Sequence, residues 1–189
     1  MILPIYAYGQ PVLKRKAADI GPGYPELQTL IANMWETMYH ADGVGLAAPQ
    51  IGLSIRLFVV DSTQVERKEK NGEGIKKVFI NAQIIEEYGE RFSMEEGCLS
   101  IPKIHGEVER PSIVRIRWMD EQFVEHEAEF DGFDARVIQH EYDHIEGKLF
   151  VEKLKPLKKR MIQRRLEEIR EGRINANYRM KFAVNRASV

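Results

Sequence analysis

The sequence predicts an α+β fold in which antiparallel β-sheets surround one central helix, with an N-terminal and a C-terminal helix packed outside. Three segments, at about 25–40, 131–147 and 156–171, carry the apolar spacing of amphipathic helices. Apolar and polar residues alternate over 114–130, as they do in strands that are buried on one face. A length of 189 residues suits a single domain with a sizeable core.

The first expected helix runs from about Pro25 to His40, because proline suits the first helical position. Asp42 and Gly43 follow and end it. Its apolar residues fall on one face, and we expect them to pack in the core rather than to form a cofactor site. They are Leu27, Leu30, Ile31, Met34, Trp35 and Met38.

The middle of the chain predicts strands joined by polar segments. Residues 54–60 and 77–85 are rich in β-branched and apolar side chains, which favours strands. The charged segment 61–74 between them is expected to be a surface loop. Further on, residues 114–118 and 124–130 are expected to form an antiparallel hairpin.

The two faces of this hairpin differ in chemistry. Arg115 and Arg117 occupy the solvent face of the first strand and meet a row of three glutamates on the second. Each contact across the strands adds at most ~1 kcal/mol. His126 falls on the apolar row, so we expect it to be packed and not to bind a metal.

The last expected helix begins at Pro156 and stops near Gly172. Its apolar stripe should dock on the body and leave basic side chains in solvent. The stripe consists of Leu157, Met161, Leu166 and Ile169. Residues 1–172 are therefore expected to form one folded domain, and 173–189 a tail that is mobile or lightly packed.

The net charge of −1 hides a strong asymmetry. Residues 1–147 hold 15 Lys and Arg against 25 Asp and Glu, a net charge of −10. Residues 148–189 hold 13 against 4, a net charge of +9. Such a basic segment is either a solvated helix face or a surface attracted to a polyanion such as RNA.

The central helix carries a metal-binding pattern, HExxH. His140 and His144 are four residues apart, so both imidazoles project from one face of a helix and reach the same ion. Glu141 is placed to accept a proton from a water molecule held on that ion. Asp131 at the N-cap and Gly147 at the C′ position bound the helix. The pattern predicts hydrolytic metal chemistry.

The residues alone leave the third metal ligand open, although a catalytic zinc site uses three protein ligands. Phe150 stands where the metzincin pattern requires a histidine, which excludes that family. Glu167 or Glu168 would make the protein a zinc peptidase, and Cys98, the only cysteine, is the other candidate. A different class of protein, an RNA-binding module with a purely structural metal, also stays open.

Three segments of the chain form a specific combination. They read GVGLAAPQIG at 43–52, EGCLS at 96–100 and QHEYDHIEG at 139–147, in that order. Together they resemble the signature motifs of the peptide deformylases, and the likeness covers roughly residues 3–170. The resemblance implies a hydrolase that removes the N-formyl group from the formyl-methionine of newly synthesised peptides and releases formate.

The same resemblance implies how the metal is held and used. Cys98, His140 and His144 are the expected metal ligands, with the fourth position open to water. Glu141 is the expected general base as metal-bound water attacks the formyl carbonyl carbon.

The oxyanion and the substrate are assigned by resemblance too. Gln50 and the backbone N–H of Leu99 would hold the developing oxyanion, and one such donor contributes ~3 kcal/mol in a dry site. The residues expected to bind the substrate are Val44, Gly45, Glu96, Gly97 and Val137.

Two arginines bear on how closely the pocket follows the family. Arg136 lies just before the third motif, where members often place apolar or small side chains that line the methionine pocket. We expect its head to snorkel to solvent while its stem packs. Glu96 resembles a carboxylate that the family holds with an arginine, and Arg110 is the candidate partner.

Cofactor, location and partners follow from the same likeness. It implies Fe2+ in the cell, with Zn2+, Ni2+ or Co2+ able to replace it. One cysteine suits a reducing cytoplasm, and no apolar run approaches the ~20 residues of a membrane-spanning helix. We expect a cytoplasmic monomer that acts on N-formylated nascent peptides and contacts the ribosome through its basic C-terminal helix.

Overall fold

A five-stranded antiparallel sheet with strand order β2-β3-β4-β5-β6 forms the main body of the fold. The computed structural model describes residues 1–65 and 73–184. The strands of the sheet are β2 (Gly45–Ala47), β3 (Leu57–Asp61), β4 (Lys76–Cys98), β5 (Ile101–Met119) and β6 (Glu125–Asp131). The α+β fold expected from the sequence is confirmed.

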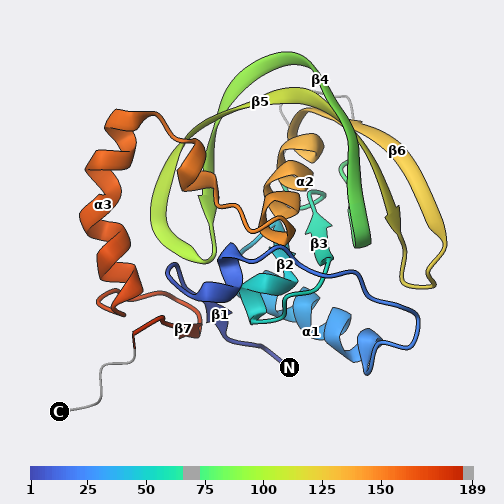
Figure 1. Ribbon diagram of the computed structural model, residues 1–189, viewed down its shortest axis with the longest axis horizontal. Helices are drawn as coiled ribbons and strands as arrows, with labels where there is room; N and C mark the ends of the chain where they lie inside the picture. The colour runs from blue at the N-terminus through green and yellow to red at the C-terminus, as the bar shows by residue number, and fades with distance from the viewer. Residues whose placement is uncertain (66–72, 185–189) are drawn as a thin grey trace.

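Strands β4 and β5 are much longer than the sequence predicts, and they arch over helix α2 (Gly132–Ile145) (Figure 1). The strand expected over 77–85 continues to Cys98, whereas the one expected over 54–60 begins only at Leu57. The register of the β4–β5 pair shifts at four places. Because such bulges bend and twist a strand pair, the sheet curves around α2 and returns Cys98 to the helix.

Helix α1 (Leu27–His40) packs its apolar face against β2 and β3. Its buried apolar side chains are Leu27, Ile31, Met34 and Met38, as predicted. The helix begins later than expected, because Glu26 has a φ of 53° and interrupts the helical path directly after Pro25.

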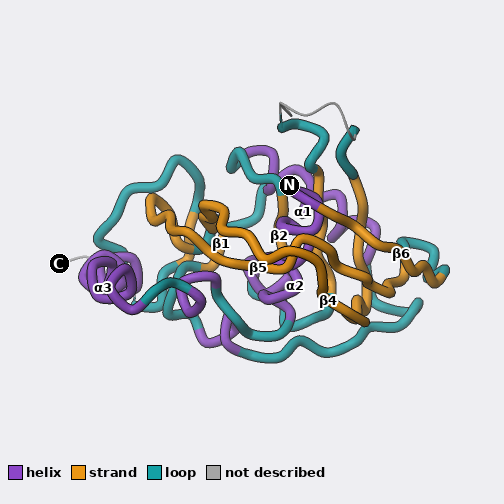
Figure 2. The backbone as a smooth tube through the Cα atoms, turned by 90° about the horizontal axis from the view of Figure 1, so that it is seen from above, coloured by secondary structure: helices purple, strands orange, loops and turns teal. Residues whose placement is uncertain are grey.

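Helix α2 is the central helix, in contact with β2, β3, β5 and β6. Figure 2 shows it against the curved strands β4 and β5, with α3 at one end of the molecule. Asp131 is its N-cap, although its side chain makes no capping hydrogen bond. Gly147, with a φ of 72°, donates its N–H to the carbonyl of His144, which confirms the predicted C-terminal stop.

The β5–β6 hairpin has the predicted pairing, with Trp118 opposite His126 and Arg117 opposite Glu127. Arg115 and Arg117 both form ion pairs with Glu127 on the exposed face. The ring of His126 stacks on Trp118 with the ring centroids 5.4 Å apart, but the residue remains exposed. His126 is thus packed on one side only.

Helix α3 (Pro156–Arg170) begins at the predicted proline, and the second half of the predicted stripe, Leu166 and Ile169, packs on the body. Ile162 and Ile169 are 4% and 1% exposed, whereas Leu157 and Met161 are 71% and 67% exposed. The expectation that Leu157 and Met161 dock on the body is wrong. Lys and Arg residues flank both the exposed and the buried apolar residues of this helix. The sequence therefore does not indicate which of the apolar residues face the body.

After α3 the chain turns at Gly172, which has a φ of 68°, and runs back along the body. Strand β7 (Met180–Lys181) pairs in parallel with β1 (Ile5–Tyr6) in a second, two-stranded sheet. Side chains over 173–184 are half-buried or exposed. The rest of the tail expected from the sequence, and the middle of the loop expected at 61–74, lie outside the described residues.

Short helices complete the connections between these elements. They are the 3-10 helices η1 (Pro11–Lys14), η2 (Ala48–Ile51) and η3 (Phe150–Lys153). Within residues 1–65 and 73–184, none of the helices has the length and apolar character to cross a membrane.

Candidate metal centre

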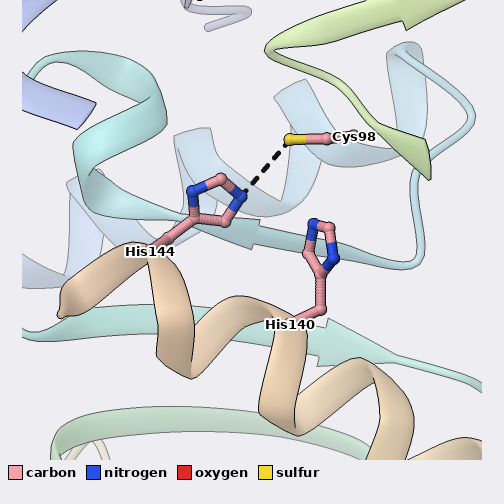
Figure 3. Close-up of side chains that lie close together, drawn as sticks. All are labelled: Cys98, His140 and His144. Carbon is pink, nitrogen blue, oxygen red and sulfur yellow. Dashed lines mark hydrogen bonds between the residues drawn. The ribbon is translucent and has the colours of Figure 1, made fainter. Parts of the chain in front are cut away.

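Three side chains from two distant parts of the sequence meet beside α2. Cys98 is the last residue of β4, and His140 and His144 project toward it from α2 (Figure 3). The Sγ atom of Cys98 lies 3.3 Å from Nε2 of His144. The ligand atoms of all three residues lie within 4.8 Å of one another. The structure brings together the three residues expected to bind the metal.

The geometry of this group fits a single metal ion. A sulfur and a nitrogen bound at about 2.3 and 2.0 Å to one tetrahedral ion stand about 3.5 Å apart, close to the observed Cys98–His144 separation. Burial is the largest cause that holds the pKa of His144 well below its ordinary value. The imidazole of His144 is therefore neutral, which is the form that ligates a metal.

Glu96 is the centre of a buried network that supports His140. The Nε and Nη2 atoms of Arg110 donate to its two carboxylate oxygens at 2.8 and 2.9 Å, and Nη1 donates to Asp143 at 2.9 Å. Burial opposes ionisation of Glu96, but hydrogen bonds from His140 and Arg110 outweigh it and hold its pKa below the ordinary value. The hypothesis that Arg110 holds Glu96 is confirmed.

Arg136 is a second partner of this carboxylate that the sequence did not suggest. The residue is 3% exposed, and its Nη1 donates to Glu96 at 2.9 Å and to the carbonyl of Val108 at 2.7 Å. Its guanidinium also lies 4.6 Å above the ring of Phe92. The prediction that Arg136 snorkels is wrong, because its charged head is paired inside the protein and not in water.

Glu141 lies on the side of α2 that faces β2. It is 4% exposed, and a Cβ atom added to Gly45 would stand 2.4 Å from its Oε1. Among the described residues, no hydrogen-bonding partner reaches its buried Oε2 atom. Burial raises the pKa of Glu141 to about 7. A carboxyl group of this kind exchanges protons close to neutral pH.

Gln50, on η2, presents an amide donor to the ligand group. Its Oε1 accepts the N–H of Ala47 at 2.9 Å, which fixes the orientation of the amide. Its Nε2 lies 3.5 Å from Sγ of Cys98 and donates to the hydroxyl of Ser100 at 3.2 Å. The N–H bonds of Gln50 therefore point toward the metal-ligand side of the pocket.

A cavity of about 400 Å³ opens over this group. It is lined by all the residues expected to bind substrate or oxyanion, which are Val44, Gly45, Gln50, Glu96, Gly97, Leu99 and Val137. Glu141 borders the same cavity. Ala176, Asn177 and Tyr178 from the tail line it as well, and no pattern in the sequence pointed to them.

The rival third ligands are not part of the group. Glu167 pairs with Arg170 at 3.6 Å and Glu168 with Arg164 at 3.3 Å, all on α3. Neither glutamate belongs to the ligand group found in the part of the chain that the structure describes. The zinc-peptidase alternative is therefore wrong.

A cysteine sulfur and two imidazoles beside a buried glutamate, on an α+β frame with an open cavity, define a metal-dependent hydrolase. A match to the polypeptide deformylase family spans residues 2–160, and the chain belongs to that family. It is an enzyme that removes the N-formyl group from newly synthesised peptides. The alternative of an RNA-binding module with a structural metal is wrong.

Relatives of known sequence and structure agree with this assignment. The chain is 54% identical to a peptide deformylase of Flavobacterium johnsoniae over 97% of both chains, and 52% identical to one of Christiangramia forsetii over 96% of both. A crystal structure of a peptide deformylase from Legionella pneumophila superposes with a TM-score of 0.79 at 38% identity. The match covers 92% of this chain and 98% of that one.

Proposed function

We propose that Glu141 is the general base and acid of the deformylation reaction. The observation that carries this role is the position of its carboxylate, buried against Gly45 in the cavity that Cys98 and His140 also line. A divalent ion held by Cys98, His140 and His144 would polarise the formyl carbonyl and make water more acidic. Glu141 takes the proton of the attacking water and passes it to the departing amine nitrogen, so formate and a free amine leave.

The developing oxyanion is held by the side-chain amide of Gln50 and the backbone N–H of Leu99. The fixed amide of Gln50 supports this role, because its oxygen is occupied by Ala47 and its Nε2 lies 3.5 Å from Sγ of Cys98, beside the cavity. It is also 1% exposed, so water does not compete for these bonds. Donors that are oriented before the reaction cost no reorganisation during it.

The substrate lies along the backbone of Val44, Gly45 and Gly97. Val137, 5% exposed on α2, contributes to the wall of the pocket for the methionine side chain. Glu96 acts differently from the role expected of it. Both of its oxygens accept hydrogen bonds from protein groups, so it orients His140 and does not hold the substrate directly.

The metal in the cell is Fe2+, and Zn2+, Ni2+ or Co2+ take the same ligands. One thiolate and two imidazoles support this range of borderline ions and do not select one of them. The measurement is metal analysis of protein purified without oxygen, together with activity after reconstitution with each ion. Activity restored by zinc but not by iron would contradict the assignment.

The assay that tests the function measures formate released from a formyl-Met peptide, with the acetyl-Met peptide as its matched control. Only the formylated peptide should react. In the same assay Glu141→Gln should lose at least about a hundredfold in kcat, the scale of a lost general base. Its metal content should be unchanged, because no ligand is removed. Full activity in Glu141→Gln would contradict the proposed role of Glu141 as general base and acid.

The enzyme works as a cytoplasmic monomer that reaches nascent chains through α3. Exposed basic side chains along α3 support attraction to ribosomal RNA, and they include Lys159, Arg160, Arg164 and Arg165. Charge reversal of Lys158, Lys159, Arg164 and Arg165 should weaken ribosome binding at low salt and leave the activity on free peptides intact. Unchanged ribosome affinity would contradict this role.

A further inference from the structure

The C-terminal segment 173–184 is joined to the body at several points along its length. The N–H groups of Ile5 and Ala7 donate to the carbonyls of Arg179 and Lys181, both at 2.9 Å. The side chain of Gln10 donates to the carbonyl of Phe182 at 2.7 Å. Backbone pairing of this kind fixes the position of the segment along β1.

The same segment reaches the turn that follows the cysteine ligand. Ala176, Asn177 and Tyr178 line the cavity beside Cys98 and Leu99. The hydroxyl of Tyr178 donates a hydrogen bond of 2.7 Å to the carbonyl oxygen of Leu99. Tyr178 is half-buried there, so the bond is partly shielded from water.

The turn from Cys98 to Ser100 is held from three sides. Tyr178 holds the carbonyl of Leu99, the N–H of Tyr8 donates to the carbonyl of Ser100 at 2.9 Å, and Gln50 donates to the hydroxyl of Ser100. The Tyr178 hydroxyl makes its contact at the carbonyl of Leu99 itself, so it holds the peptide plane that follows Leu99.

We propose that Tyr178 is a positioning residue for the deformylation reaction: by holding the carbonyl of Leu99, it aims the N–H of Leu99 at the reacting carbonyl oxygen. The two groups belong to neighbouring peptide units that meet at the Cα of Leu99 and turn about separate dihedrals. Holding the carbonyl fixes the Cα of Leu99 and restricts ψ, which narrows the directions that the N–H can take. This inference rests on the proposed function, in which the Leu99 N–H is an oxyanion donor.

A donor that is no longer held loses part of its effect on the transition state and little of its effect on substrate binding. Tyr178→Phe removes the hydroxyl and keeps the ring that lines the cavity. We expect kcat to fall about fivefold while KM changes less than twofold. A fivefold change corresponds to about 1 kcal/mol, the typical net contribution of one hydrogen bond.

The matched control is Tyr6→Phe. The hydroxyl of Tyr6 accepts a hydrogen bond from Nζ of Lys181 at 3.1 Å, so this variant also removes a contact between the C-terminal segment and the body. Tyr6 does not line the cavity, and kcat should therefore stay at the level of the unmodified enzyme.

Two further measurements separate positioning from a structural role. Amide hydrogen exchange at Leu99 and Ser100 should become faster in Tyr178→Phe than in Tyr6→Phe. The absorption spectrum of the Co2+-loaded enzyme should be the same in both variants, because the ligands do not move. An unchanged kcat in Tyr178→Phe, or equal losses of kcat in both variants, would overturn the proposal.

Gln50→Ala, measured in parallel, distinguishes failure of this inference from failure of the function on which it rests. If Gln50→Ala lowers kcat strongly and Tyr178→Phe does not, only the positioning role of Tyr178 is wrong. If Gln50→Ala also leaves kcat unchanged, the oxyanion assignment itself is wrong.

Discussion

The Nδ1 atom of His140 lies 2.8 Å from the Oε1 atom of Glu96. Because Nδ1 donates to this carboxylate, the ring presents Nε2 to the metal group and its rotation is restricted. Glu96 is itself held by Arg110 and Arg136. The orientation of one metal ligand thus depends on two arginines on different elements.

Replacing the carboxylate should weaken metal binding without removing a ligand. Glu96→Gln keeps the shape of the side chain but removes the charge that orients His140. Loss of such a partner typically lowers metal affinity about 10- to 100-fold. Competition with a chromogenic chelator measures it, and Glu107→Gln, an exposed position on β5, is the control. Equal affinities in both variants would show that Glu96 does not orient the ring.

Removing one partner of the buried ion network should destabilise the fold. Arg110→Met leaves Asp143 without its guanidinium partner and Glu96 with only Arg136 and His140, and we expect a loss of about 3–5 kcal/mol in the free energy of unfolding. Arg115→Met breaks an exposed ion pair with Glu127 that water screens, so the free energy of unfolding should change far less. Urea unfolding of both proteins provides the comparison, and similar midpoints would contradict the expectation.

A single methyl group should displace the proposed general base. In Gly45→Ala the new Cβ would stand 2.4 Å from Oε1 of Glu141, so the carboxylate has to move. We expect kcat on a formyl-Met peptide to fall at least about tenfold, since misplacement by about 1 Å can cost a hundredfold. Gly23→Ala is the control, because no atom lies within 4 Å of its added Cβ. Retention of full activity by Gly45→Ala would mean that Glu141 need not occupy this position.

Two neighbouring residues of α3 should differ in their effect on stability, because one is buried and the other is exposed. Ile162→Ala should lower the free energy of unfolding by about 2–4 kcal/mol, because the side chain is 4% exposed in the core. Met161→Ala, at a position 67% exposed, should change it by less than about 0.5 kcal/mol. Thermal or urea unfolding measures both changes. A larger loss of stability in Met161→Ala than in Ile162→Ala would mean that Met161 is buried, as the sequence predicted.

The catalytic helix could be predicted because its signals are local. The spacing of His140 and His144, the N-cap position of Asp131 and the stop at Gly147 all depend on neighbours along one helix. The β5–β6 pairing was predictable for a similar reason, since alternation fixes which side chains share a face.

What could not be predicted depends on partners far along the chain. The continuation of β4 to Cys98 comes from its pairing with β5 and its bulges, not from strand propensity. Arg136 looks like a surface residue in the sequence, and only the fold supplies Glu96 as its partner. The first half of the α3 stripe was wrong because Leu157 and Met161 are as apolar as Leu166 and Ile169, which pack on the body.

Lys181 and Tyr6 are in contact although they are 175 positions apart in the sequence. Strand β7 therefore cannot pair with β1 until all the residues between them have been translated. A growing chain that already carries both histidines of α2 still lacks the strand that brings the 173–184 segment to the pocket. The pairing of β7 with β1 is therefore a long-range contact, a kind that forms slowly because a long loop has to close first. This enzyme edits the first residue of other proteins, and its own strand β1 pairs with β7 only after the residues that follow α3 have been translated.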